Sequence, residues 1–116
     1  MMDVVELDGR TLIGWTSFHT SFARAFGFPS WYGRNQDAWI DVMEEALSER
    51  LLSQRLLTQH AARPGPLVLQ ITWWPELRDA GPDQATALVS LVAALNARSQ
   101  EAGGPLLLAL APVEGA

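Results

Sequence analysis

Two short apolar runs, with a helical segment between them, limit the folds open to this chain more than any other feature. The runs cover residues 67–72 and 106–110, and each has the length of a buried strand. The segment between them opens at Gly81-Pro82-Asp83 and then carries apolar residues at helical spacing: Leu88, Leu91, Val92 and Leu95. Because a strand–helix–strand crossover is right-handed, we expect both strands to run parallel in one sheet.

The first part of the chain predicts one strand and one helix. Residues 3–8 form a strand candidate, and Thr16 or Ser17 is expected to cap the helix that follows. The phenylalanines that mark the buried stripe of this helix recur every four residues: Phe18, Phe22 and Phe26. Gly27 and Pro29 are expected to end it.

A second helix is expected to begin after Asn35, a favourable N-cap residue. Its buried side is expected to carry Trp39, Met43, Ala46 and Leu47. The apolar pattern continues to Leu57, so this segment is either one long helix or two, ended by Arg63-Pro-Gly-Pro. Trp73-Trp74-Pro75 follows the strand at 67–72, and a loop is expected between it and the last helix.

Together these elements predict an α/β protein with the order β-α-α-(α)-β-α-β. The expected architecture has two layers, a three-stranded parallel sheet and the helices packed against it. At 116 residues the chain is expected to be a single domain spanning 1–116.

The charge balance argues against several classes of partner. All 8 basic residues are Arg, and 13 acidic residues give a formal net charge of −5. We expect no direct binding to nucleic acid or to anionic membranes, because both need a basic face, whereas a cationic protein is favoured. The chain has no Cys, no signal-peptide pattern at its start and no apolar run near the roughly 20 residues that span a bilayer. We therefore expect a cytoplasmic protein without a cofactor, monomeric when free.

Residues 28–41 carry the most information about function. They read Phe-Pro-Ser-Trp-Tyr-Gly-Arg-Asn-Gln-Asp-Ala-Trp-Ile-Asp, an aromatic turn that leads directly into a helix. Trp31 and Tyr32 either pack in the core or anchor a partner, since both residue types are enriched in binding hot spots. Gly33 is expected to allow a left-handed or tight backbone.

The outer face of the second helix is acidic. Asp37, Asp41 and Glu44 cluster there, with Glu45 at the edge. Carboxylates four residues apart destabilise a helix by about 0.2–0.5 kcal/mol, and no Lys or Arg on this helix turn offsets them. The face is either simply solvated, with Asp37 stabilising the positive helix end, or a docking surface for a basic partner.

Signals for catalysis are weak. His19 lies among phenylalanines and His60 in an expected loop, and neither has an acidic or nucleophilic neighbour in the sequence. Their spacing with Asp37 matches no metal site. A pair of carboxylates such as Asp37 and Asp41 is in principle able to bind Mg²⁺ or to act as acid and base, so a metal-dependent enzyme remains an alternative.

At residues 31–41 the chain resembles the barstar family of intracellular ribonuclease inhibitors. In that family an aromatic-Tyr-Gly-x-Asn-x-Asp-Ala-x-x-Asp segment opens the second helix, and the order of the other elements also matches. The resemblance implies a small parallel three-stranded sheet with helices packed on it. It also implies that the second helix and the turn before it enter the active site of a basic ribonuclease, where carboxylates take the place of RNA phosphate.

Carried over by position, the resemblance makes Asp41 the central carboxylate in that active site, with Asp37 beside it and Trp31 as the aromatic contact. The implied partner-binding residues are Trp31, Tyr32, Gly33, Arg34, Asn35, Asp37, Ala38, Asp41, Glu44 and Glu45. No catalytic residue and no metal ligand is expected.

Three features depart from the family pattern. Arg34 stands where an acid is expected, Arg98 stands at the position of another expected acid, and residues 48–63 form a longer connection. We therefore expect the partner to have a different rim. The partner is either a basic ribonuclease or another cationic protein, bound by an interaction module with the same fold.

Overall fold

The computed structural model describes residues 3–58 and 65–115, with the backbone alone from 53 to 58. In the described part the elements follow one another as β1 (Val4–Asp8), a 3₁₀ helix η1 (Gly9–Leu12), α1 (Trp15–Phe26), α2 (Gln36–Thr58), β2 (Leu67–Thr72), α3 (Trp74–Ala80), α4 (Pro82–Glu101) and β3 (Leu108–Pro112). This arrangement confirms the expected α/β class.

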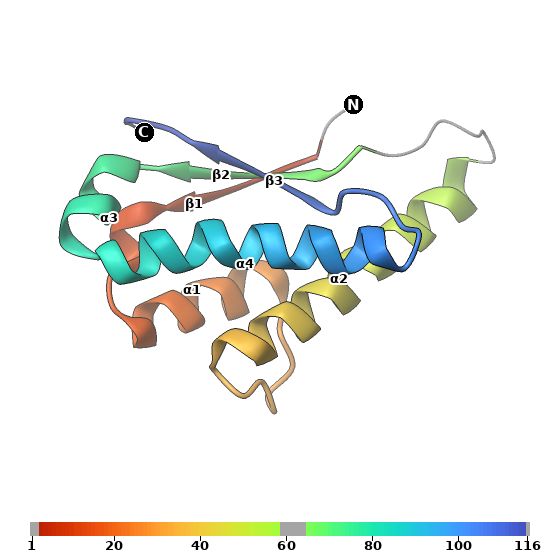
Figure 1. Cartoon of the computed structure of the whole chain (residues 1–116), viewed down its shortest axis with the longest axis horizontal. Helices are drawn as coiled ribbons and strands as arrows, with labels where there is room; N and C mark the ends of the chain where they lie inside the picture. The colour runs from red at the N-terminus through yellow and green to blue at the C-terminus, as the bar shows by residue number, and fades with distance from the viewer. Residues whose placement is uncertain (1–2, 59–64, 116) are drawn as a thin grey trace.

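The sheet has three parallel strands in the order β1-β2-β3, as predicted. β2 lies in the middle, so that Leu69 pairs with Val5 on one side and with Leu110 on the other. Helices α1, α2 and α4 lie on one side of the sheet and form the second layer (Figure 1). Successive side chains of a strand point to opposite faces of the sheet. The leucines of β2 are buried, and they therefore lie on the face that the helices cover.

The core lies between these two layers. Phe18 and Phe22 of α1 are fully buried, which confirms the predicted stripe, while Phe26 is partly buried at its end. Trp39 of α2 is also fully buried, and its ring meets Phe22 edge-on with the ring centroids 5.5 Å apart. The other fully buried large side chains are Leu12, Met43, Leu47, Leu69, Ile71, Leu77, Leu88, Leu95 and Leu108.

A loop was expected between Pro75 and the last helix, and this expectation is wrong. Residues 74–80 form α3, which starts because Trp73 adopts a left-handed backbone (φ 54°) that turns the chain sharply out of β2. Pro75 and Glu76 then lie in the first turn, where a fixed φ and a negative charge both favour a helix. Pro75 and Glu76 therefore support the helix once Trp73 has turned the chain.

Three predicted element ends also shift. α1 begins at Trp15 with Gly14 as its N-cap, and neither Thr16 nor Ser17 caps it. β3 begins at Leu108, because Asn96 of α4 binds the chain before it, accepting hydrogen bonds from the Leu107 and Leu108 amides at 2.9 and 3.1 Å. The second helix is one helix as far as Thr58. Its predicted end at 63–66 falls partly on residues 59–64, outside the described part of the chain.

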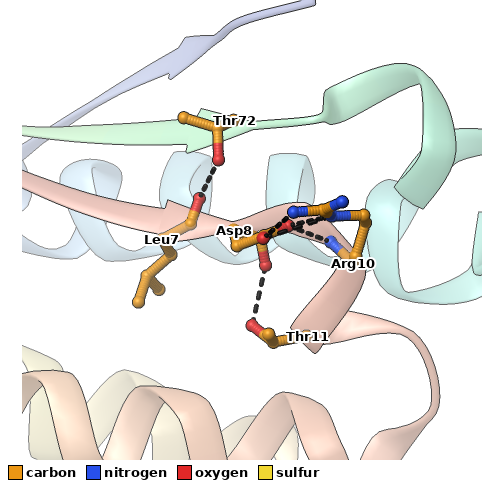
Figure 2. Close-up of polar contacts among 5 residues, drawn as sticks. All are labelled: Leu7, Asp8, Arg10, Thr11 and Thr72. Carbon is orange, nitrogen blue, oxygen red and sulfur yellow. Dashed lines mark hydrogen bonds and ion pairs between the residues drawn. The ribbon is translucent and has the colours of Figure 1, made fainter. Parts of the chain in front are cut away.

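The carboxyl end of β1 holds a compact polar cluster (Figure 2). Asp8 accepts hydrogen bonds from the backbone and the side chain of Arg10, at 2.9 Å from N and 2.7 Å from Nη2, and the Arg10 guanidinium lowers the pKa of Asp8. The guanidinium also lies over the Trp73 ring, 4.4 Å from its centroid. This end of a parallel sheet is where ligands often bind. Here Arg10 and Trp73 pack against each other beside it.

Trp39 offers a direct test of how the core holds α2. We expect Trp39→Ala to lower the free energy of unfolding by about 3–5 kcal/mol, because it removes a fully buried indole. Trp31→Ala is the matched control, since Trp31 is 71% exposed and its removal should change stability by less than about 0.5 kcal/mol. Denaturant unfolding of both variants measures the difference, and similar losses would contradict this account of the core.

Candidate protein-binding surface

The turn between α1 and α2 projects away from the sheet on the far side of the helical layer (Figure 1). α1 ends at Gly27, whose left-handed backbone (φ 65°) reverses the chain as its sequence predicts. The Phe28 amide then donates to the Ala23 carbonyl at 3.0 Å, and the Tyr32 amide donates to the Pro29 carbonyl at 3.0 Å. These backbone bonds hold the turn in a defined shape.

The turn enters α2 through Asn35, the predicted N-cap. Its Oδ1 accepts a hydrogen bond from the Ala38 amide at 2.8 Å, which satisfies one of the free donors at the helix start. The left-handed residue of the turn is Arg34 (φ 54°), so the left-handed alternative expected for Gly33 does not hold. Gly33 instead packs tightly, because a Cβ there would lie 3.3 Å from Asn35 Nδ2 and 3.4 Å from Ala38 Cβ.

Trp31 and Tyr32 are neighbours with opposite environments. Trp31 is exposed, whereas Tyr32 is buried against Phe28, with the two ring centroids 4.7 Å apart. The Tyr32 hydroxyl is hydrogen-bonded to Nδ1 of His19, and burial raises the pKa of Tyr32 to about 12. Tyr32 therefore packs in the core, the first of the two alternatives considered for this pair. Trp31 alone of the two exposes its ring to solvent.

Arg34 points back toward α1. Its Nη2 donates to the Thr16 carbonyl at 2.9 Å and to Thr20 Oγ1 at 2.8 Å. These bonds compensate the less favourable left-handed backbone at a residue that is not glycine. The positive charge is therefore held beside α1 and does not extend from the tip of the turn.

The acidic ridge, which we define as Asp37, Asp41, Glu44 and Glu45, lies on the outer side of the first turns of α2. Asp37, Asp41 and Glu45 are exposed and Glu44 is partly buried. Asp37 lies in the first turn, where a carboxylate interacts favourably with the positive helix end. Ala38 is partly buried between the ridge and the turn. The acidic ridge thus lies at the start of the helix that directly follows the turn with Trp31.

No Lys or Arg lies on the first turns of α2, but α4 supplies a cation to the ridge. Arg98 Nη2 lies 2.8 Å from Asp41 Oδ1, and Arg98 Nε lies 2.7 Å from Glu44 Oε2. Glu44 Oε2 has no well-aligned hydrogen bond among the described residues, so its contact with Arg98 is a charge pair. Asp41 and then Glu44 raise the pKa of Arg98. Asp41 is therefore paired in the free protein, which corrects the expectation that the ridge is without a counter-ion.

A small hollow adjoins the ridge on the side of the turn. It has a volume of about 220 Å³ and lies between the turn and α2. Its lining includes Phe28, Pro29, Trp31, Val42, Glu45 and Glu49. The hollow combines an apolar floor with two carboxylates, a combination that suits the aliphatic stem and charged head of a basic side chain.

The structure describes one of the two histidines considered for catalysis. His19 is buried under the turn, and the other histidine, His60, lies outside the described residues. Within 3–58 and 65–115, no group of three or more His, Cys, Asp or Glu side chains is placed to hold a metal ion. Among the described helices, none is long and apolar enough to cross a membrane.

Comparison with known proteins places the chain in a family. A family model described as Barstar (barnase inhibitor) matches residues 2–111, nearly the whole chain. The chain therefore belongs to the barstar family. A search of the curated proteins gives no significant match.

The buried histidine predicts a pH dependence of stability. Burial, and then the nearby Arg34 charge, lower the pKa of His19 in the folded protein. An unfolded histidine titrates near about 6.5, so below that pH the unfolded state binds more protons than the folded state. This part of the stability is therefore complete above about pH 6.5 and is lost as the pH falls toward the lowered folded value.

His19→Gln should remove this part of the pH dependence, whereas His60→Gln, the control that removes the other histidine, should keep it. Free energies of unfolding measured from pH 7.5 down to pH 5 at about half-unit steps would show the difference as a smaller slope in the His19 variant. The same slope in both variants would contradict the role given to His19.

Proposed function

We propose that this protein inhibits a basic ribonuclease by inserting the acidic ridge and the turn with Trp31 into the cationic active-site cleft. The observation that carries the proposal is the exposure of Asp37 and Asp41 on one face at the start of α2, the helix that directly follows the turn with the 71% exposed Trp31. Membership of a family described as barnase inhibitors supports the same reading. It also favours an inhibitor over the metal-dependent enzyme considered from Asp37 and Asp41.

The rigidity of the surface supports this proposal. α2 is held from its inner side by Trp39 and Met43, both fully buried, and from its start by the Asn35 cap. The carboxylates on its outer side are therefore ordered before the partner arrives. An interface formed by ordered groups avoids the entropic cost of arranging them during binding.

The chemistry of the partner supports it as well. A ribonuclease binds RNA through basic side chains that neutralise phosphates, so its empty cleft has a strongly positive potential. Carboxylates of an inserted helix satisfy those cations without offering a bond that the enzyme cleaves. In this arrangement Asp41 meets the centre of the cleft, Asp37 lies beside it, and Trp31 covers an aromatic or basic side chain at the edge.

The remaining residues have supporting roles in the proposal. Gly33 and Asn35 set the shape of the turn, and Ala38 leaves room for close approach. Glu44 and Glu45 add charge at the rim. Tyr32 acts from beneath by holding the turn on His19, and Arg34 does so through Thr16 and Thr20.

Removal of the central carboxylate tests the proposal. With barnase as the probe, we expect Asp41→Ala to weaken binding by about 2–5 kcal/mol, the range known for desolvated interface charge pairs, those of barstar complexes among them. Asp83→Ala is the matched control, because Asp83 is an exposed acid in the first turn of α4 and its loss changes the net charge equally. Calorimetric titration measures both, alongside inhibition of RNA cleavage. Equal binding after removal of both Asp37 and Asp41 would refute the proposal.

The rate of association offers a second test. If the ridge steers the encounter, the association rate constant for barnase should fall steeply as ionic strength rises, while the dissociation rate changes little. Stopped-flow measurements over a series of salt concentrations separate the two rates. An association rate that is insensitive to salt would contradict electrostatic docking. Tight binding without inhibition of RNA cleavage would instead favour an interaction module for another cationic protein.

A further inference from the structure

Arg98 contacts the acidic ridge as an arginine from another protein would. Two different nitrogens of its guanidinium contact two carboxylates, Nη2 at 2.8 Å from Asp41 Oδ1 and Nε at 2.7 Å from Glu44 Oε2. Asp41 and Glu44 are three residues apart and so lie on the same side of α2. A planar guanidinium with several donors is well suited to join two such groups.

This contact is not what joins the two helices. α2 and α4 pack against each other in the core, to which both contribute fully buried side chains such as Met43 and Leu95. The side chains of Arg98 and Asp41 are 49% and 64% exposed, so water and salt screen their attraction. The guanidinium can therefore leave Asp41 without loss of the packing between the helices.

Arg98 also has a favourable place when it is unpaired. It lies in the last turn of α4, where the helix dipole favours a positive charge whether or not a carboxylate is present. Beside it is a hollow of about 590 Å³ between α2, α4 and the chain that follows α4. Ser48, Leu52, Ser99 and Gly104 are among the residues that line this hollow, which is large enough to receive the released side chain.

We propose that Arg98 is an intramolecular competitor of the partner. It occupies Asp41 and Glu44 in the free protein and releases them when a cation of the partner arrives. This inference rests on the proposed function, because it concerns the same carboxylates. It assigns to Arg98 a role in affinity and selectivity, since a partner has to displace a cation that is tethered to the protein itself.

Two consequences follow for binding. Arg98 lowers the negative potential of the ridge, which slows the approach of every cationic partner. Arg98 also weakens the binding of a partner that offers a single charge. It weakens less the binding of a partner whose guanidinium is able to contact both carboxylates. The selectivity arises because the tethered arginine remains nearby after displacement and competes for the same oxygens.

A short peptide tests the inference without a cognate enzyme. The probe is an acetylated, amidated tetra-arginine peptide, titrated at low salt into the ¹⁵N-labelled full chain and followed by amide shifts along α2. Arg98→Gln removes the competing charge. Arg78→Gln is the matched control, because Arg78 is also an exposed arginine in an ion pair, with Asp79. Both lie in α3, beside the start of α4 (Figure 1), whereas Arg98 lies in the last turn of α4.

We expect R98Q to bind the peptide roughly three- to tenfold more tightly than R78Q, with the largest shifts around Asp41 and Glu44. R98K keeps the charge but contacts the two carboxylates less well, so its affinity for the peptide should lie between those of the unmodified chain and R98Q. Equal affinities of R98Q and R78Q would show that only net charge matters, and this outcome would overturn the inference. Absence of shifts on the ridge in R98Q would overturn it as well.

The proposed function fails in a different way. Ribonuclease inhibition that persists in the Asp37→Asn and Asp41→Asn double variant refutes the proposed function, whatever the peptide shows. A ribonuclease that needs Asp41 but binds R98Q and R78Q equally well leaves the proposed function intact and overturns the role of Arg98.

Discussion

The orientation of α2 depends on the burial of one indole. Trp39 is fully buried and meets Phe22 of α1 edge-on, so its side of the helix faces the core. At about 100° per residue, the positions two before and two after it, Asp37 and Asp41, point almost the opposite way. The packing that stabilises the core therefore also decides which charges the protein presents to solvent.

The turn before α2 depends on polar contacts with α1. His19 holds Tyr32 from below, and Arg34 reaches Thr16 and Thr20 from the side. Trp31, directly before the first of these anchors, is exposed at the surface. Arg34, the residue that departs most clearly from the family pattern within this segment, thus has a structural use that does not place its charge at the tip of the turn.

The fold was predictable because its signals are local and periodic. The phenylalanine stripe, the leucines of α4 and the apolar run of β2 each repeat with the period of one element, and the crossover rule then gives a parallel sheet. α3 was missed because a left-handed Trp73 creates its start, and no residue type at that position announces such a backbone. The N-cap of α2 was found because Asn35 carries its own signal.

The candidate site was predictable in part for a related reason. The carboxylates of α2 and their common face follow from helix geometry alone. The sequence could not decide between exposure and burial for Trp31 and Tyr32, because adjacent residues in a turn have no fixed period. The contact of Arg98 with Asp41 joins residues 57 positions apart, and such a pairing depends on how α2 and α4 pack. Residues 31–41 matched a known pattern, but that pattern does not contain Arg98.

The projecting turn has a consequence for the shape of any partner. The carboxyl end of the sheet, where many α/β proteins hold small molecules, has Arg10 and Trp73 packed against each other. Recognition by the turn and the start of α2 is recognition by a protrusion (Figure 1). A flat surface would meet only the end of this protrusion, whereas a cleft would enclose more of it. The depth of the partner's cleft, and not its charge alone, then decides how many carboxylates it meets.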